Sequence, residues 1–397
     1  MGTGELSAAR LGRLHEVMAG YVERGAVPGL VALVSRRGET HVEVLGNMAV
    51  TGIEPMRRDT LFRIASLTKP ITAAAAMILV EECVLRLDAP VDPWLPELAD
   101  PRVLRTLDSP LDETVPAQRP ITLRDLLTMR LGIGLILAPP DQYPIQQAIA
   151  DAELAPGPNP PTVSPDEWMA RLGGLPLLYQ PGACWLYHTA FDVLGILIAR
   201  ASGQTLEKFL RERLFAPLGM TATSFAVPAD RLDRLPPSYL SDGRGGLAVH
   251  DNPRASRWGG DIQFEAGGGG LVSTIDDYHA FYRMLLRKGQ HDGGRILARP
   301  SIELMTMDHL TPAQKAGAEM FFGDTRGWGF GVGVTVRRDD LAAPGSFGWT
   351  GGTGTMAAVD PQEGLIGILM TQRLMESPAP PPIFSDFWTL AHAAIDD

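Results

Sequence analysis

The sequence predicts an α+β fold: an antiparallel sheet built from both chain ends, flanked by helices, with a mostly helical domain inserted between the two ends. Runs typical of β-strands lie near both ends, whereas the middle has helical apolar spacing and long stretches rich in Pro and Gly. No internal repeat is present. We therefore expect residues 1–85 and 250–397 to form one α/β domain with a central antiparallel sheet, and residues 86–249 to form a mostly helical domain.

The N-terminal part of the sheet is predicted as a helix followed by a hairpin. Residues 6–24 have the apolar spacing of a helix, and residues 30–35 and 40–46 are β-rich runs separated by Arg-Arg-Gly-Glu. A helix start precedes the apolar run over residues 71–80.

The middle of the chain is predicted to be helical and rich in loops. Helical spacing occurs over residues 123–129, 165–172, 190–201, 206–214 and 276–287. The proline-rich stretch 155–161 is predicted to be a rigid surface loop rather than a domain linker, because helical pattern resumes soon after it.

The C-terminal part completes the predicted sheet. β-patterns are found over residues 330–337, 354–360 and 365–372, with turns predicted at 339–340 and 361–364 and a closing helix over 383–395.

Composition and charge exclude several classes of function. The chain has 397 residues, of which 45% are hydrophobic and 20% charged, as in an ordinary folded protein. A net charge of −11 and a pI near 5.3 argue against binding nucleic acid or an anionic membrane. The N-terminus lacks the features of a signal peptide and no apolar stretch has membrane-spanning length, so we expect a cytoplasmic protein.

The cysteines and histidines do not predict a metal site. Cys83 and Cys184 lie in apolar sequence surroundings, and we expect buried free thiols rather than a disulfide. The eight histidines are scattered without the spacing of ligands, and no H-E-x-x-H motif occurs. We expect neither a metal nor a cofactor.

Ser66 and Lys69 are the most informative pair of residues. They are three positions apart at the predicted helix start, so their side chains share one face and can meet. A serine hydroxyl needs a base to become a nucleophile, and a lysine can serve when burial or a neighbouring cation keeps its amine neutral. Arginine cannot serve, because its guanidinium stays protonated.

Usage of basic residues makes this lysine unusual. Only four of the 35 basic residues are lysines, and Lys69 is one of them. Nearly every other position with a positive side chain has arginine. The alternative is a structural lysine, because a bare S-x-x-K pattern occurs by chance about once in a chain of this size.

Tyr187 is a second candidate, in a turn that leads into an apolar helix. If it lies beside Lys69, the cation favours the phenolate, which can take the Ser66 proton and later activate water. The alternative is a buried aromatic residue whose hydroxyl satisfies a hydrogen bond.

Two glycine-rich segments allow close approach of the backbone to a ligand. Residues 348–355 precede an apolar strand, so an amide there can join the Ser66 amide as a donor pair for the oxygen of a tetrahedral intermediate. The alternative is a tight β-turn with a surface tryptophan. Residues 265–274 are a flexible loop that matches neither a P-loop nor a Rossmann loop. The absence of G-x-S-x-G argues against an α/β-hydrolase.

Together these motifs resemble the serine β-lactamase and penicillin-binding-protein superfamily, particularly the class C-like carboxylesterases called family VIII. The resemblance runs from about residue 11 to the C-terminus, and it rests on Phe-Arg-Ile-Ala-Ser-Leu-Thr-Lys at 62–69, Ile-Thr-Leu-Arg-Asp-Leu-Leu at 121–127, Pro-Gly at 181–182, Ala-Pro-Leu-Gly-Met at 216–220 and Gly-Gly-Gly-Leu-Val-Ser-Thr at 268–274.

The resemblance implies a β-lactamase-like fold with the active site between the two domains. It implies that Ser66 is the nucleophile, Lys69 the proton-transfer partner and Tyr187 the general base that opens a Y-x-N element. It further implies that the amides of Ser66 and Gly352 form an oxyanion hole.

The chain departs from the family pattern in three places, and the first two bear on the substrate. Trp349-Thr350-Gly351 replaces K-T-G, so the cation that would pair with an antibiotic carboxylate is missing. Thr189 ends the Y-x-N element and lacks the amide side chain that would hold an acylamide. Residues 129–132 replace the usual H-T-S-G.

These features lead to the hypothesis of a cofactor-free serine carboxylesterase that hydrolyses small-molecule esters of short acyl chains through a Ser66 acyl-enzyme. Trp349, Thr350, Gly351 and Thr189 are the expected substrate-binding residues. The alternatives are a β-lactamase, a D-amino peptidase or an acyltransferase on the same fold, and, in a different class, a non-catalytic ligand-binding protein. The sequence does not indicate an oligomeric state.

Overall fold

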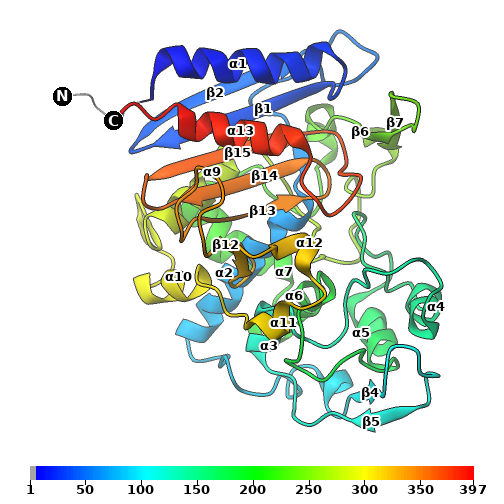
Figure 1. Ribbon diagram of the computed structural model, residues 1–397. Coiled ribbons are helices and arrows are strands. Elements are labelled where there is room, and N and C mark those ends of the chain that lie inside the picture. Colours follow the sequence, from blue (N-terminus) through cyan, green and yellow to red (C-terminus); the bar gives the residue numbers. More distant parts are fainter. Residues whose placement is uncertain (1–5) are drawn as a thin grey trace.

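A seven-stranded antiparallel sheet organises the computed structural model, which describes residues 6–397 (Figure 1). In spatial order its strands are β11 (Arg326–Trp328), β12 (Gly333–Thr335), β13 (Phe347–Gly351), β14 (Thr355–Asp360), β15 (Leu365–Thr371), β1 (Gly29–Arg36) and β2 (Glu39–Gly46). Strand β1 pairs with β15 along its length, with Ala32 opposite Leu369. The prediction of a sheet closed by both chain ends is therefore confirmed.

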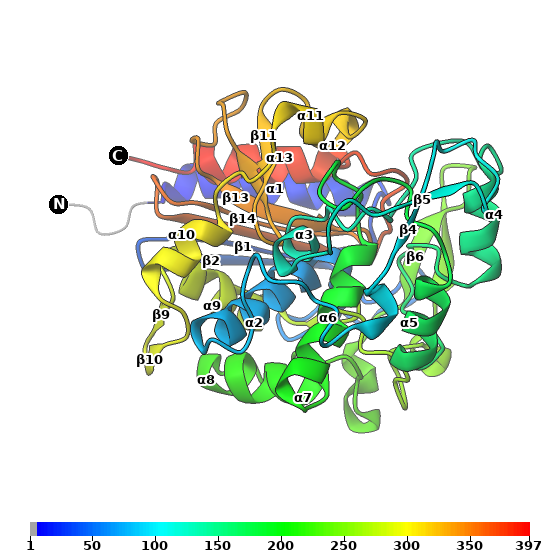
Figure 2. The same cartoon turned by 90° about the horizontal axis from the view of Figure 1, so that it is seen from below.

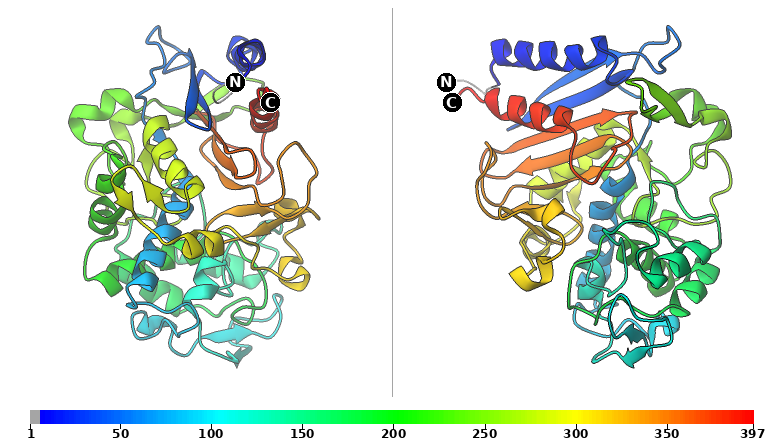
Figure 3. Two further views of the ribbon diagram at one scale, coloured as in Figure 1. Left: turned by 90° about the vertical axis from the view of Figure 1, so that its left-hand side faces the viewer. Right: turned by 45° about the vertical axis from the view of Figure 1, so that its right-hand side comes forward.

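Two terminal helices cover one face of the sheet. Helices α1 (Ala8–Glu23) and α13 (Pro382–Ala393) pack against each other on this face (Figure 3, right). Leu14 of α1 and Phe387 of α13 are fully buried there with Leu369 of the sheet. The amphipathic terminal segments thus find the apolar surface that their spacing requires.

The opposite face of the sheet meets the helices that carry the site. Helix α9 (Ile275–Leu286) contacts β1, β14 and β15, and the 3₁₀ turn Ala65–Leu67 that leads into α2 (Thr68–Glu81) contacts β13 and β14. Side chains of β1 alternate: Leu30 and Val34 pack toward the terminal helices, whereas Val31 and Leu33 join the larger core. The sheet is therefore a shared wall between two apolar cores.

Helix α2 lies at the centre of the molecule. It contacts α6 (Thr189–Ser202), and the two helices lie side by side in the view from below (Figure 2). Residues 68–79 of α2 are all buried. A helix that is apolar on every side is stable only when it is enclosed, and α2 packs against α6, α7 (Leu206–Leu210) and α10 (Arg299–Met305).

The remaining elements are short and lie in the inserted and connecting segments. The helices are α3 (Leu123–Leu127), α4 (Pro144–Asp151), α5 (Pro165–Gly173), α7 (Leu206–Leu210), α8 (Ala216–Leu218), α10 (Arg299–Met305), α11 (Pro312–Lys315) and α12 (Glu319–Phe322). The two-stranded pairs are β3 (Phe62–Arg63) with β8 (Val272–Ser273), β4 (Arg102–Leu104) with β5 (Thr114–Pro116), β6 (Ser238–Ser241) with β7 (Leu247–Asp251), and β9 (Gln290–His291) with β10 (Gly294–Arg295). The boundaries of the two proposed domains remain a prediction, and residues 1–5 lie outside the described chain.

Three expectations differ from the structure. The strand predicted over 330–337 is shorter, because only Gly333–Thr335 pair with the neighbouring strands β11 and β13. The glycine-rich segment 348–355 is mostly strand, since β13 extends to Gly351 and only the following three residues turn. The thiols are free, but Cys83 is exposed and Cys184 half-buried. Cys83 has φ 59° just beyond the end of α2, where the chain leaves the core.

Among residues 6–397, no helix combines the length and the hydropathy needed to cross a membrane.

We predict that Phe387→Ala lowers the free energy of unfolding by about 3–5 kcal/mol, because a fully buried aromatic ring leaves a cavity between α13 and the sheet. Val249→Ala is the control, since Val249 is 55% exposed and should change stability by about 0.5 kcal/mol or less. Chemical denaturation measures both variants, and equal effects would contradict the assigned packing.

Candidate active site

Ser66 and Lys69 meet at the start of α2, as their spacing predicts. Ser66 lies in the 3₁₀ turn Ala65–Leu67, and the Lys69 Nζ donates to Ser66 Oγ over 2.9 Å. Ala65 has φ 43°, a conformation that is uncommon for a residue with a side chain. Backbone strain next to a reactive side chain is typical of active sites.

The Lys69 amine is completely buried. It also donates to the Gly268 carbonyl over 2.6 Å and lies 3.3 Å from His188 Nδ1. Burial lowers the pKa of Lys69 to about 7, although the charge of Asp192 opposes that shift. A large fraction of the lysine is thus a neutral amine at neutral pH and can accept the Ser66 proton.

Tyr187 lies beside Lys69, but the contact is with its ring. Lys69 Nζ lies 4.6 Å from the ring centroid, and the Tyr187 hydroxyl accepts from Trp349 Nε1 over 2.6 Å. Burial raises the pKa of Tyr187 to about 12, against hydrogen bonds with Ser66 and Trp349 that favour the phenolate. The expected effect of the lysine cation on the hydroxyl is therefore weak, and Lys69 is the stronger candidate base at neutral pH.

The turn between β13 and β14 is joined to the segment that precedes Ser66. Thr353 Oγ1 donates to the Arg63 carbonyl, and Thr355 Oγ1 donates to the Ile64 carbonyl over 3.2 Å. A Cβ on Gly351 would lie 2.3 Å from the Ile64 oxygen, so only glycine permits this approach. The turn holds Gly352 at the same cavity as Ser66.

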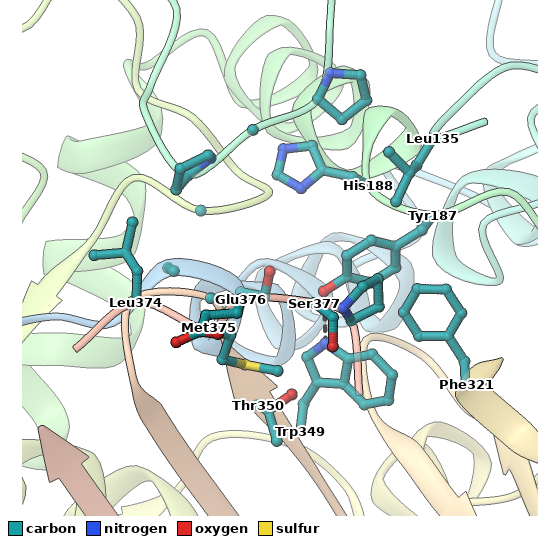
Figure 4. Close-up of a pocket in the computed structure, with 18 residues that line it drawn as sticks. Leu135, Tyr187, His188, Phe321, Trp349, Thr350, Leu374, Met375, Glu376 and Ser377 are labelled. Atoms are coloured by element: carbon teal, nitrogen blue, oxygen red, sulfur yellow. Dashed lines mark hydrogen bonds between the residues drawn. The ribbon is translucent and has the colours of Figure 1, made fainter. Parts of the chain in front are cut away.

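A cavity of about 260 Å³ opens above Ser66. Figure 4 shows Tyr187, Trp349 and Phe321 gathered on one side of it and Leu374 and Met375 on the other. Its lining comprises Ala65, Ser66, Leu135, Pro156, Gly157, Pro158, Tyr187, His188, Gly269, Phe321, Trp349, Thr350, Gly352, Leu374, Met375, Glu376, Ser377 and Pro378.

Within the described chain, no lysine or arginine lines this cavity. The acidic Glu376 is present and pairs with Arg373 over 2.5 Å. Burial lowers the pKa of His188, which favours its neutral form. The cavity therefore presents no fixed cation to a negatively charged substrate.

The other predicted substrate-binding residues take different positions. Trp349 and Thr350 line the cavity, whereas Gly351 lies behind it against the Ile64 backbone. Thr189 is buried as the first residue of α6 and lines a neighbouring hollow rather than this cavity.

Sequence reasoning missed His188 and Asp192. His188 lines the cavity, and its Nε2 lies 3.2 Å from Asp192 Oδ2. Their spacing of four residues at the start of a predicted helix was a signal for this contact. Phe321 and the residues 374–378 were also missed, because they come from distant parts of the chain and only the fold brings them to the cavity. In residues 6–397, no group of three or more His, Cys, Asp or Glu is placed to hold a metal ion.

Comparison with known proteins identifies relatives over most of the chain. The family model described as Beta-lactamase matches residues 14–382. Protein Rv1367c of Mycobacterium tuberculosis is 38% identical over 361 residues, covering 88% of this chain and 87% of that protein. Esterase EstB of Burkholderia gladioli is 32% identical over 404 residues, covering 95% and 94%. The solved structure of EstCE1, described as a hydrolase with promiscuous acyltransferase activity, superposes with a TM-score of 0.79 at 23% identity, covering 97% and 98%.

We predict that Gly351→Ala lowers kcat/KM for an ester by about 10- to 100-fold, because the new Cβ displaces the turn from the Ile64 backbone and misplaces Gly352. Gly12→Ala is the control, since no atom lies within 4 Å of the added Cβ. Steady-state kinetics measures both variants. Unchanged kinetics in a folded Gly351→Ala protein would contradict this role of the turn.

We predict that Lys69→Met abolishes activity while raising Tm by about 2 °C or more, because a buried ionisable amine is replaced by an apolar chain of similar length. In the wild type, kcat/KM should fall as pH drops through about 7, since protonation removes the neutral amine. Differential scanning calorimetry and pH-dependent kinetics measure the two effects. An active Lys69→Met protein would show that the lysine is structural.

Proposed function

The chain belongs to the beta-lactamase family, and on this premise we propose that it is a serine carboxylesterase that hydrolyses neutral esters of short acyl chains. Family membership and the relative named Esterase EstB support an enzyme that hydrolyses or transfers acyl groups through a serine. The observation that carries the narrower proposal is the cavity above Ser66, which has a nucleophile and a buried base but no lysine or arginine among its described lining residues.

Acylation begins when Ser66 Oγ attacks the carbonyl carbon of the ester. The Ser66 proton passes to the neutral Lys69 amine as the bond between Oγ and the acyl carbon forms. Negative charge then develops on the carbonyl oxygen, where the backbone N–H groups of Ser66 and Gly352 donate. Collapse breaks the bond to the alkoxide, which leaves with a proton from the Lys69 ammonium.

Hydrolysis of the acyl-enzyme reverses these proton transfers. A water molecule replaces the alcohol and loses a proton to Lys69 as its oxygen attacks the acyl carbon. Collapse of this second tetrahedral intermediate breaks the bond between the acyl carbon and Ser66 Oγ, and Ser66 takes the proton back from Lys69 as the acid leaves. The Tyr187 hydroxyl lies beside this path and is held by the Trp349 indole. Its role in the proposal is to orient the water and Ser66 Oγ by hydrogen bonds while remaining a neutral phenol at rest.

Trp349 decides the substrate class in this proposal. Its indole Nε1 donates a hydrogen bond to the Tyr187 hydroxyl, and the rest of the ring forms an apolar wall with Phe321. A neutral donor cannot supply the attraction that a lysine offers to a carboxylate. Neutral esters are therefore favoured over β-lactams and over peptides that end in a carboxylate.

Acyl transfer is a second candidate function, favoured by a separate observation. A hollow of about 520 Å³ adjoins the catalytic cavity and shares Phe321, Trp349, Thr350 and Pro378 with it. An acceptor alcohol larger than water fits beside the acyl-enzyme there. The same Ser66 chemistry then gives a new ester instead of an acid.

We predict that the wild type hydrolyses p-nitrophenyl butyrate far faster than a chromogenic cephalosporin, and that Ser66→Ala lowers ester hydrolysis by about 10⁴-fold or more. Thr51→Ala, which removes a hydroxyl at an exposed position between β2 and β3, is the control and should keep full activity. Preference for the cephalosporin would overturn the inference from the missing cation. Activity that survives in Ser66→Ala would overturn the assignment of Ser66 as the nucleophile.

The same assay distinguishes hydrolysis from acyl transfer. With a series of alcohols present, a hydrolase releases mainly butyrate, whereas an acyltransferase forms butyrate esters at alcohol concentrations far below that of water. Product analysis by gas chromatography measures the ratio.

A further inference from the structure

His188 is held in a strained backbone conformation between Tyr187 and α6. It has φ 85° and ψ −69°, and Thr189 N donates to the Tyr187 carbonyl over 3.3 Å. This is the rare γ-turn in its strained form, which persists only where other contacts enforce it. His188 is also the N-cap residue of α6, yet its side chain makes no capping hydrogen bond. The turn therefore directs the imidazole elsewhere.

The imidazole lies between the Lys69 amine and a carboxylate. Its Nδ1 is 3.3 Å from Lys69 Nζ and its Nε2 is 3.2 Å from Asp192 Oδ2. A carboxylate only accepts hydrogen bonds, so Asp192 fixes the proton on Nε2 and leaves the Nδ1 lone pair facing the lysine. The side chain is 13% exposed, and His188 lines the catalytic cavity.

Gly268 closes this arrangement from the other side. Its N–H donates to Asp192 Oδ1 over 2.9 Å, and its carbonyl accepts from Lys69 Nζ over 2.6 Å. A Cβ at this position would lie 2.9 Å from Asp192 Oδ1 and 3.2 Å from His188 Nε2. The glycine-rich segment, which matched no phosphate loop, thus makes room for the histidine and the carboxylate.

We propose that His188 and Asp192 are positioning residues. Together with Ser66 and Lys69 they form a hydrogen-bonded chain of four side chains, called the relay below, that holds the lysine in place. This inference rests on the proposed function. When Lys69 takes the Ser66 proton, the ammonium has three N–H groups, and three acceptors surround it: Ser66 Oγ, the Gly268 carbonyl and His188 Nδ1. The proton stays on Lys69 until the leaving alcohol takes it.

The relay also orients the lysine. With two acceptors fixed by the backbone and by the Asp192-held imidazole, the remaining direction of the amine is toward Ser66. A histidine and an aspartate four residues apart can form an ion pair on the surface of any helix. Such a pair would need neither the strained turn at His188 nor the contact with the buried Lys69 amine. Within the described chain, Tyr187, His188 and Asp192 are the titratable side chains that face Lys69.

Two substitutions of the same chemistry test the role of Nδ1. The side-chain oxygen of His188→Asn takes the place of Nδ1, whereas that of His188→Gln reaches the place of Nε2. We expect kcat for p-nitrophenyl butyrate to fall about 10-fold in His188→Asn and about 100-fold in His188→Gln, with KM little changed. His15→Asn on α1, where the side chain is 52% exposed, should match the wild type.

Asp192→Asn tests the relay through the pH dependence of kcat/KM, which a loss of stability alone would not shift. Removing the carboxylate lowers the pKa of Lys69 further, so the acid limb of kcat/KM should move to lower pH while its plateau falls. Independently of turnover, ¹⁵N NMR of the histidine-labelled resting enzyme should show His188 as the neutral Nε2–H tautomer, assigned by the signal lost in His188→Asn.

The outcomes separate this inference from the proposed function. Loss of activity in Ser66→Ala together with unchanged rates and pH profiles in the His188 and Asp192 variants would overturn the relay alone. Equal losses in His188→Asn and His188→Gln, or an Nδ1–H tautomer at rest, would also overturn it. Activity in Ser66→Ala would overturn the serine mechanism itself.

Discussion

The burial of one amine is the constraint on which the rest of this structure depends. Lys69 has no exposed surface, and a charged ammonium in such a place is costly unless its N–H groups are satisfied. The protein meets that cost in two ways: burial lowers the pKa to about 7, and acceptors surround the nitrogen. In the proposed mechanism both are needed, because the lysine must be neutral before it takes a proton and stable after it has done so.

The large sheet serves this constraint by fixing the backbone around α2. The turn after β13 is tied to residues 63 and 64 by two threonine hydroxyls, and Gly351 permits the backbones to touch. Strand β14 continues from this turn into the pairing with β15, and β15 pairs with β1 near the start of the chain. The position of Gly352 relative to Ser66 therefore depends on contacts that span the whole sequence.

Reactivity and substrate choice are separable in this site. Ser66 lines the cavity with Lys69 buried beside it, whereas Trp349, Phe321 and Leu374 form walls of the cavity. In the proposed function, an indole in place of a cation changes what the walls attract without moving Ser66. One fold can keep the same reacting groups while the lining of its cavity varies, so members of one family can act on different substrates.

The sequence by itself determined the features that are local. Three-residue spacing brings Ser66 and Lys69 together on any helix, and nearly continuous apolar runs define β1, β14 and β15 whatever their partners. Tertiary structure alone decided that Lys69 meets the ring of Tyr187, that His188 turns inward under strain, and that Gly268 and Phe321 reach the site. The physical reason is range: rotation along a helix or strand is fixed by neighbouring residues, whereas burial, pKa and the approach of distant loops depend on how the chain packs.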